Sequence, residues 1–480
     1  MKSDLERFTD EFFQELLEGN AALFAGAGLS KPAGFVDWKE LVRPLAEELG
    51  LNAELETDFI AIAQFHVNAH QRNRHRLHQA IIDALSVDVE PTESHYILSQ
   101  LPIFTWWTTN YDKLIEESLK RAGKIADVKI FVSQLALTRK NRDAIVYKMH
   151  GDVDRPDEAV ATRDDYERYH LDRGAFVNAL AGDLVSKTFL FLGFSFTDPN
   201  LDQVLSRVRI TFQDNQRRHY AFFKKSVRRK EEDEESFRNG QVKQNLMIED
   251  LKRFNIKSIL IDDYDEIPRA LNCILSRYRR RTVFLSSSAS SFDPWGEHEV
   301  LRFMRQLGSA LSSTGLRLST GLGSGVGDAL LSGALDKVLR DDTRKIEDGL
   351  ILRPFPQLIE DAKEKQEIWE RYRQDMIGAA GISLFLFGNK ETPCGNVLAD
   401  GMEREFQIAR EHSSIVLPIG ATGSMARKLA DISLKNRERY LPELNDDQVA
   451  ALIDLNEHRE NLSELIEPII RLINELKEAK

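Results

Sequence analysis

Short runs of apolar and β-branched residues alternate along the chain with longer segments of helical periodicity. Ten of these runs predict β-strands, and five fall in each half of the chain. Strands that alternate with helices indicate parallel sheets covered by helices, so we expect an α/β fold. The predicted strands span residues 21–25, 104–108, 145–149, 188–192, 258–261, 283–286, 317–320, 350–352, 382–387 and 415–419.

The pattern changes near residue 280, where the basic run Arg279–Arg281 ends a helical segment and a new strand follows. The chain has 480 residues, which is more than one core usually holds, because domains run to about 100–200 residues. We therefore expect one domain over residues 1–280 and a second over residues 281–480. Within the first, the highly charged segment 224–244 predicts a solvated helix or loop.

The composition is that of a globular chain, with 42% hydrophobic and 30% charged residues and a formal net charge of −12. These values exclude a collagen, a wholly disordered chain and a coiled-coil rod, and the charge argues against nucleic acid as a partner. Two cysteines, Cys273 and Cys394, are too few for a disulfide framework or a four-thiolate zinc site, so we expect no metal. The longest nearly apolar stretch, 377–387, is too short to span a membrane, and the N-terminus lacks the apolar stretch of a signal peptide. We expect a cytoplasmic protein without a membrane partner.

In parallel sheets, ligands bind beyond the carboxyl ends of the strands. Polar or glycine-rich segments follow four strands of the first half, and the fold should bring them together. Gly26 and Gly28 in the first segment allow a tight turn and a close approach to a phosphate, although a plain strand-to-helix turn would need them equally. The four segments are GAGLS at 26–30, TTNYD at 108–112, KMHGD at 148–152 and GFSFTDPN at 193–200.

In this order and at strand ends, these segments resemble the sirtuin (SIR2) family. GAGLS is similar to the phosphate-binding turn of that family, TTNYD to its Thr-x-Asn-x-Asp segment, and the Met-His-Gly at 149–151 to its His-Gly. The resemblance covers most of residues 10–275 and implies binding of NAD+. The chain lacks the four zinc-ribbon cysteines of deacylating sirtuins, and residues 34–38 read Gly-Phe-Val-Asp-Trp where the family has Asp-Phe-Arg. NAD+ hydrolysis is therefore favoured, and the alternatives are a protein deacylase or ADP-ribosyltransferase, or a non-catalytic nucleotide-binding scaffold.

The resemblance suggests a role for individual residues. Cleavage of the nicotinamide–ribose bond develops oxocarbenium character, as in glycoside hydrolysis. In the expected catalytic pair, Asn110 would hold a water or the nicotinamide, and His150 would accept a proton from water or a ribose hydroxyl. Asp112 either orients this pair or caps the helix after it, and Asp198 either contacts NAD+ or caps the helix that begins near Pro199. The expected NAD+-binding residues are Gly26, Ala27, Gly28, Ser30, Asp112, Ser195 and Asp198.

The second half has its own glycine-rich turn. Residues 321–327 read GLGSGVG between a predicted strand and a helix, which favours a nucleotide phosphate turn over a flexible loop. Arg373 and Lys390 can hold a pyrophosphate, and Glu405 can accept ribose hydroxyls. The glycine run and the serines at 286–288 resemble SLOG domains, which are Rossmann-like nucleotide sensors. The Pro-Gly-Gly-x-Gly-Thr motif of related hydrolases is missing, which favours sensing over catalysis.

The expected fold is thus two Rossmann-like domains with parallel sheets, an N-terminal SIR2-like domain and a C-terminal SLOG-like domain. This order, with segments such as YKMHGDV at 147–153 and LILRPFPQ at 350–357, resembles the NADase effectors of Thoeris antiphage defence. The resemblance implies activation by a cyclic ADP-ribose isomer from a partner TIR-domain protein, depletion of NAD+ in the infected cell, and a homotetramer. The sequence leaves open which isomer binds, how the resting state is inhibited, and whether part of the product is cyclised. The residues expected to bind the signal are Ser286, Gly321, Gly323, Arg373, Lys390 and Glu405.

Overall fold

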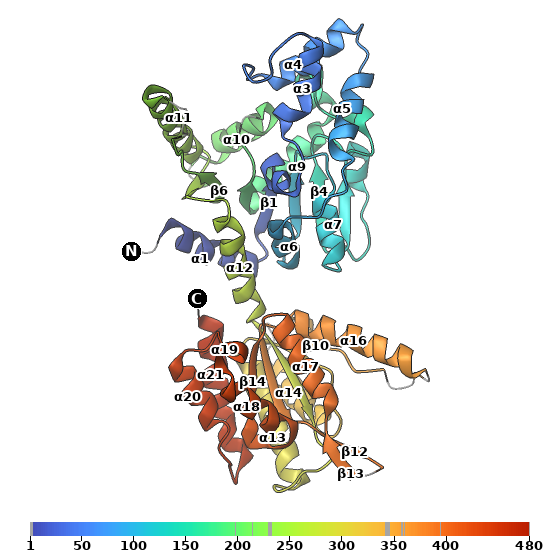
Figure 1. Cartoon of the computed structure of the whole chain (residues 1–480), viewed down its shortest axis with the longest axis vertical. Helices are drawn as coiled ribbons and strands as arrows, with labels where there is room; N and C mark the ends of the chain where they lie inside the picture. The colour runs from blue at the N-terminus through green and yellow to red at the C-terminus, as the bar shows by residue number, and fades with distance from the viewer. Residues whose placement is uncertain are drawn as a thin grey trace. The chain divides into compact units, whose positions relative to one another are not determined.

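The computed structural model forms two compact units, Met1–Leu275 and Ser276–Lys480 (Figure 1). The boundary falls within helix α12 (Glu266–Arg279). Thr197, in one of the strand-end segments, and Cys394 lie outside the described residues. The structure describes residues 3–479 except 197, 214, 229–232, 341–345, 357, 358, 360 and 394.

The first unit is built on a seven-stranded sheet in the order β3-β4-β2-β1-β5-β6-β7, and every pairing is parallel. The central strand β1 is buried at each of its five positions, because helices cover both faces of the sheet. The strands are β1 (Ala21–Ala25), β2 (Thr105–Thr108), β3 (Ala126–Lys129), β4 (Ala144–Lys148), β5 (Thr188–Leu192), β6 (His219–Lys224) and β7 (Ile256–Ile261).

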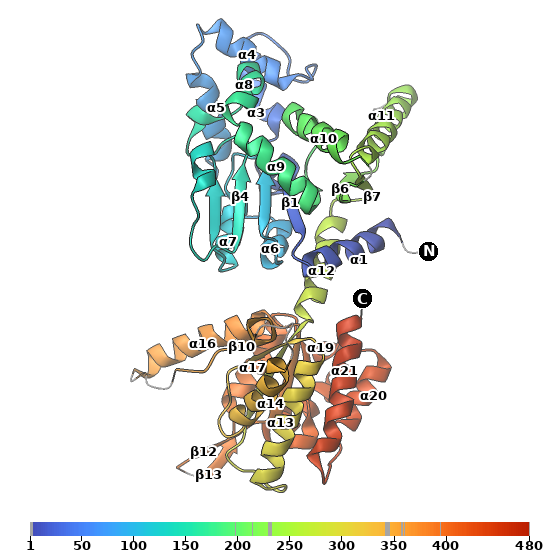
Figure 2. The ribbon, with the colours of Figure 1, turned by 180° about the vertical axis from the view of Figure 1, so that it is seen from behind.

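Helices α9 and α10 lie on one face of this sheet, and α6 and α7 lie on the other (Figures 1 and 2). Phe176 and Leu180 of α9 and Leu201 of α10 join Phe24 and Phe191 of the strands in one apolar core. The helices of this unit before α12 are α1 (Asp4–Leu17), α2 (Ala27–Ser30), α3 (Trp38–Glu48), α4 (Phe59–Ala69), α5 (His75–Leu85), α6 (Glu93–Gln100), α7 (Leu114–Arg121), α8 (Arg163–Asp172), α9 (Gly174–Ser186), α10 (Pro199–Phe212) and α11 (Glu234–Lys252).

Helices α3, α4 and α5 are inserted between β1 and β2, and we call them the cover. They have an apolar core of their own that includes Leu41, Ile62, Leu77 and Ile81. In Figure 1 they lie at the top of the first unit, beyond the carboxyl ends of β1 and β4. The cover therefore lies next to the carboxyl edge of the seven-stranded sheet, where the four strand-end segments begin.

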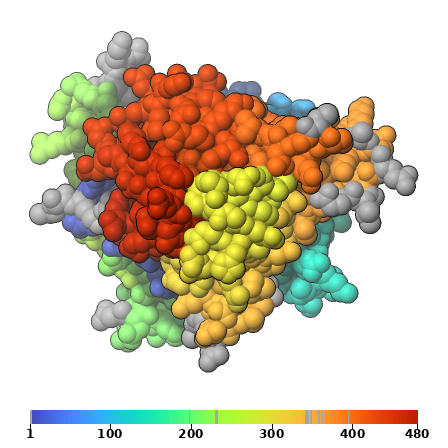
Figure 3. Space-filling view, turned by 90° about the horizontal axis from the view of Figure 1, so that it is seen from below, coloured from blue at the N-terminus to red at the C-terminus, as the bar shows by residue number. Residues whose placement is uncertain are grey.

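The second unit holds a five-stranded parallel sheet in the order β10-β9-β8-β11-β14. A two-stranded antiparallel hairpin, β12 with β13, accompanies it. Near its C-terminus the chain returns to α13, where Ser463 Oγ donates to Gln306 Oε1 at 2.8 Å; Figure 3 shows the red C-terminal segment against the yellow one. The strands are β8 (Thr282–Ser288), β9 (Arg317–Thr320), β10 (Leu350–Leu352), β11 (Ile382–Phe387), β12 (Asn389–Thr392), β13 (Gly395–Leu398) and β14 (Ile415–Pro418). The helices are α13 (Glu297–Ser313), α14 (Gly327–Leu339), α15 (Ile346–Gly349), α16 (Ala362–Gly378), α17 (Asp400–Glu411), α18 (Ser424–Lys435), α19 (Arg437–Tyr440), α20 (Asp446–Asp454) and α21 (Ile466–Glu478).

The α/β class and the parallel sheets are confirmed, and all ten predicted strands are present, each within one or two residues at either end. Residues 234–244 of the charged segment form the first part of α11, in which the only buried residue among those described is Leu251, so a solvated helix is confirmed for that part. The prediction missed β3, β6 and the hairpin. Lys390, which follows the predicted strand 382–387, lies in β12 of the missed hairpin. Among the described residues, no helix has both the length and the apolar character needed to cross a membrane.

Candidate functional site

The four strand-end segments of the first unit meet around a cavity of about 600 Å³. The sheet register explains this, because Ala25 of β1 pairs with Thr108 of β2 and with Leu192 of β5, while Thr108 pairs with Lys148 of β4. The strands thus end at one level and their following residues converge. Eight of the nine residues predicted for this site line the cavity, and Gly26 does not. The eight are Ala27, Gly28, Ser30, Asn110, Asp112, His150, Ser195 and Asp198.

Gly26 and Gly28 allow two loops to touch. The N–H of Gly28 donates to the carbonyl of Gly193, and the N–H of Gly26 donates to the carbonyl of Leu192, both at 2.9 Å. A Cβ on Gly26 would lie 2.5 Å from the Gly193 oxygen, and a Cβ on Gly28 would lie 2.8 Å from the Gly193 Cα. Gly193 itself has a φ of +64°, which favours glycine. This packing accounts for the glycines without a bound phosphate.

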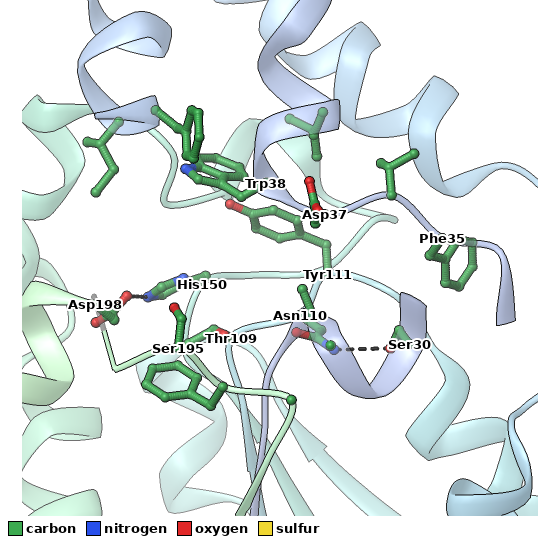
Figure 4. Close-up of a pocket in the computed structure, with 18 of the residues that line it drawn as sticks. Ser30, Phe35, Asp37, Trp38, Thr109, Asn110, Tyr111, His150, Ser195 and Asp198 are labelled. Atoms are coloured by element: carbon green, nitrogen blue, oxygen red, sulfur yellow. Dashed lines mark hydrogen bonds and ion pairs between the residues drawn. The ribbon is translucent and has the colours of Figure 1, made fainter. Parts of the chain in front are cut away.

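The amide of Asn110 is fixed by its neighbours. Its Nδ2 donates to the carbonyl of Gly26 and to Ser30 Oγ, both at 3.1 Å (Figure 4). Its backbone N–H donates to Thr108 Oγ1 at 3.0 Å, and that hydroxyl donates to the carbonyl of Ala25 at 3.0 Å. Both amide hydrogens are therefore in use. A ligand would instead bind the Oδ1 oxygen, by donating a hydrogen bond to it.

His150 lies beside a buried carboxylate. Its Nε2 is 3.2 Å from Asp198 Oδ2, and both side chains are less than one tenth exposed (Figure 4). The ring meets Tyr166 edge-on, with 5.5 Å between ring centroids, and Tyr169 with 6.2 Å. Tyr166 Oη also donates to Asp198 Oδ2 at 3.3 Å. The imidazole is therefore held between two aromatic rings and Asp198, a pairing that the sequence did not reveal.

Asp198 and Asp112 both bind backbone groups at the starts of helices. Asp198 Oδ1 accepts from the N–H groups of Asn200 and Leu201 at 3.0 Å, so it is the N-cap of α10. Asp112 Oδ1 accepts from the N–H of Leu114, also at 3.0 Å. Burial alone would raise the pKa of Asp198, but His150 and these hydrogen bonds hold it below its usual value. Asp198 is therefore a charged cap whose other oxygen faces His150.

Lys148 joins two of the converging segments. Its side chain is fully buried, and its Nζ donates to the carbonyl of Tyr111 at 3.1 Å and of Asp112 at 2.6 Å. It also donates to the carboxylates of Asp152 and Glu116. Although burial favours the neutral amine, these carboxylates raise the pKa of Lys148, so the ammonium is retained. The lysine therefore ties the segment that holds Asn110 to the one that holds His150.

In the second unit, three predicted residues form one contact chain. Ser286 Oγ donates to Glu405 Oε2 at 2.5 Å, and Arg373 Nε donates to Glu405 Oε1 at 3.4 Å. Burial raises the pKa of Glu405, although the serine and the arginine oppose that shift. The Arg373 guanidinium lies over the rings of Phe355 and Trp369, 5.2 and 5.7 Å from their centroids.

The other three residues predicted to bind the signal lie near this group of contacts. Lys390 and Arg373 line the same surface hollow of about 1190 Å³, and Lys390 Nζ donates to Asp400 at 2.5 Å. Gly321 packs on Phe355, since a Cβ there would lie 2.6 Å from the ring. Gly323 packs on the end of β8, because a Cβ would lie 1.5 Å from the carbonyl of Ser287. Neither glycine lines the hollow.

Comparison with known proteins follows the same division. A model described as "SIR2-like domain" matches residues 105–245, and one described as "Sir2- and TIR-associating SLOG family" matches residues 266–476. "NAD(+) hydrolase ThsA" of Bacillus cereus (strain MSX-D12) is 45% identical over 473 residues, which cover 98% of each chain. The protein of the same name from Acinetobacter baumannii (strain 532279) is 46% identical over 97% of this chain and 98% of its own. The chain belongs to the ThsA family of NAD(+) hydrolases. A shorter match, 25% identical over 43% of this chain and 21% of the other, is to "Defense-associated sirtuin 2" of Bacillus subtilis.

For this ThsA-family chain, sequence reasoning missed the side of the cavity formed by the cover. Trp38 of α3, Phe59 and Ile60 of α4, and Leu85 at the end of α5 line it, and Tyr166 of α8 lies next to His150. In Figure 4 the Trp38 and Tyr111 rings lie above His150, Ser195 and Asn110. The one available signal was Trp38, an aromatic residue soon after the glycine turn; nothing in the sequence marks Tyr166.

Proposed function

We propose that this chain hydrolyses NAD+ to nicotinamide and ADP-ribose in the cavity at the carboxyl edge of the seven-stranded sheet. The observation that carries the proposal is the convergence of Asn110 and His150, from separate strands, on one cavity of about 600 Å³. That volume is typical of a small-molecule site. Family membership supports NAD+ as the substrate, since the relatives are named NAD(+) hydrolases.

In the proposed reaction, the bond between ribose C1′ and the cationic nicotinamide breaks, and nicotinamide leaves with the electron pair as a neutral amide. Water adds to C1′ and loses one proton. The main demands are orientation and a group that accepts this proton, because the leaving group is already good. Asn110 Oδ1 would hold the water or the nicotinamide amide, and the His150 ring would take the proton.

Asp198 would set the tautomer of His150. A carboxylate 3.2 Å from Nε2 favours a proton on that nitrogen, which leaves Nδ1 with the lone pair that accepts the proton from water. The cover would restrict bulk water, since Trp38 and Phe59 line the cavity with apolar rings. We assign Ala27, Gly28, Ser30 and Ser195 to NAD+ binding because they line the same cavity.

We propose further that the first unit carries the hydrolase and the second carries a sensor for a cyclic ADP-ribose isomer, supplied by a TIR-domain partner in antiphage defence. Arg373 and Lys390 line the same hollow and offer cations for a pyrophosphate, and Glu405, which contacts Ser286 and Arg373, offers a carboxylate for ribose hydroxyls. An unrestrained NADase would deplete its own cell, so signal binding must select the active arrangement. A shift from 1:99 to 99:1 needs about 10⁴-fold preference, or about 5.5 kcal/mol. We also propose a homotetramer. In a homotetramer, signal molecules bound to several subunits would together supply this free-energy difference.

Chromatography of NAD+ reaction products, with and without candidate isomers, tests both parts. We expect nicotinamide and ADP-ribose in equal amounts, formed much faster when the correct isomer is present. Constitutive hydrolysis that no isomer changes would refute the sensor, and absence of nicotinamide under every condition would refute the hydrolase.

Arg373→Ala tests the sensor site separately. The variant should weaken signal binding by calorimetry, because it removes the cation that Phe355 and Trp369 hold against Glu405. NAD+ affinity should stay as in the wild type. Unchanged signal affinity would remove Arg373 from the site.

A further inference from the structure

The cover carries a cluster of three potential metal ligands that the proposed chemistry does not use. Glu48 is the last residue of α3, His66 lies on α4, and His70 is the residue directly after α4. One ligand atom from each lies within 4.8 Å of the other two. None of the three lines the cavity that contains His150.

The spacing of the two histidines suits a shared ion. The residues are four apart in sequence, and their imidazoles stack with 4.1 Å between ring centroids. The lone pair of each nitrogen lies in its ring plane, so the exposed His70 ring must turn out of the stack before both rings can bind one ion. His70 Nδ1 is 2.9 Å from the carbonyl oxygen of His66. A carbonyl only accepts hydrogen bonds, so this nitrogen carries the proton and Nε2 keeps its lone pair. Histidines that bind metals are commonly oriented by such a bond to a backbone carbonyl.

Glu48 is oriented in a comparable way. Its Oε1 accepts from Arg76 Nε at 3.1 Å, and its Oε2 lies 2.7 Å from His66 Nε2. Arg76 belongs to α5, so the cluster joins all three helices of the cover. The arginine binds one carboxylate oxygen and leaves the other directed at the histidine.

His66 is the least satisfied member of the cluster. The residue is fully buried, and its Nδ1 has no hydrogen-bond partner within the described part of the chain. The other ring nitrogen, Nε2, lies 2.7 Å from Glu48 Oε2, so Nε2 is the atom of His66 that would bind an ion shared with Glu48. An ion bound there would leave Nδ1 without a partner, because the two ring nitrogens point to different sides of the imidazole.

The separations also fit a tetrahedral ion. Bonds of about 2.0–2.2 Å to zinc put two ligand atoms about 3.3 Å apart in that geometry. The shortest pair in the cluster is 2.7 Å and all pairs are within 4.8 Å, so small side-chain movements reach the required spacing. Two imidazoles and one carboxylate are a ligand set typical of zinc, with water completing the fourth position.

We propose that Glu48, His66 and His70 bind a divalent transition metal, with zinc as the best fit. Such an ion would connect α3 and α4 at the cluster, while other residues of the same two helices, Trp38 and Phe59, line the cavity. The site would stabilise the cover without taking part in the chemistry at His150. It departs from the sequence-based expectation of no metal, which considered thiolate ligands only.

The test uses metal-free, tag-free full-length chain titrated with cobalt(II), followed by competition with zinc(II). We expect one equivalent of cobalt with the intense visible absorption of a tetrahedral complex, and displacement of that cobalt by zinc. His70→Ala should weaken cobalt affinity by more than about 100-fold. Mutation of a residue that only supports a ligand typically lowers metal affinity by about 10–100-fold, and loss of a ligand itself should lower it further. Zinc should raise the melting temperature of the wild type but not of the variant.

His75→Ala is the matched control, because His75 is an exposed histidine of the cover outside the cluster. It should bind cobalt as the wild type does. Glu48→Gln is the second variant; its amide can still contact His66 but lacks the anionic ligand. A wild-type chain without the intense cobalt spectrum, or equal cobalt affinity in the wild type, His70→Ala and Glu48→Gln, would overturn the proposal. The NAD+ assay is separate, so neither result bears on hydrolysis.

Discussion

Replacement of Lys148 by methionine tests whether a buried ammonium holds the site together. The substitution keeps most of the side-chain volume but removes the charge that Glu116 and Asp152 share, and both carboxylates are buried or nearly so. Loss of one partner from a buried ion pair costs about 3–5 kcal/mol, because a charge is left uncompensated. Burial raises the pKa of Glu116, so protonation of that carboxyl keeps the loss within this range. We expect the free energy of unfolding to fall by about 3–5 kcal/mol.

The assay is urea unfolding of the full-length chain followed by tryptophan fluorescence, with Lys113→Met as the control. Lys113 pairs with Asp154 at the surface, where both side chains are about half exposed or more. Exposed pairs contribute about 0–1 kcal/mol, so the control should change little. The reasoning is refuted if Lys148→Met and Lys113→Met destabilise the protein equally. NAD+ turnover should also fall in Lys148→Met, since the Tyr111 and Asp112 carbonyls lose their shared donor.

Two further predictions concern titrating groups. Asp198→Asn should lower kcat at least about tenfold and alter its pH profile, because asparagine still caps the helix but carries no negative charge beside His150. Burial lowers the pKa of His219 to about 3, and its Nδ1 accepts from the N–H of Phe189, so the folded protein holds this ring neutral. The unfolded chain takes up the proton below about pH 6.5, and stability is therefore lost as pH falls from about 6.5 towards 3, at up to about 1.4 kcal/mol per unit. In urea titrations over that window, His219→Asn should show a shallower decline than the wild type.

Each of these predictions has a clear contradiction. If Asp198→Asn retains the wild-type kcat and pH profile, then the carboxylate serves only as a helix cap. If wild type and His219→Asn lose stability in parallel between pH 6.5 and 4, then His219 is protonated in the folded state as easily as in the unfolded chain.

Much of the fold was predictable because its signals are local. The central strands, such as Ala21–Ala25 and Ile382–Phe387, are continuous apolar runs with turn residues after them. The edge strand β3 reads Ala-Asp-Val-Lys, where Asp127 pairs with Lys129, and nothing in that pattern separates it from a loop. Strand β6 ends where the charged segment begins, so no turn residues mark its end and the pattern did not identify it as a strand.

The site was predictable to the extent that strand ends converge in a parallel sheet. Asn110 and His150 follow adjacent strands, so their meeting at one edge depends only on topology. The contact of His150 with Asp198 and Tyr166 depends instead on where α8 and α10 begin, which tertiary packing decides. The cover likewise could not be foreseen as a cavity wall, because its position follows from an apolar core assembled by three separate helices.

The central claim is that NAD+ lies across the carboxyl edge of the seven-stranded sheet with its glycosidic carbon beside His150. The most direct measurement is a crystal structure of the His150→Ala variant soaked with NAD+, in which the intact substrate should persist. The account predicts the nicotinamide ribose next to position 150 and the pyrophosphate near residues 26–30. NAD+ bound elsewhere, with this cavity filled by the protein's own side chains, would contradict it.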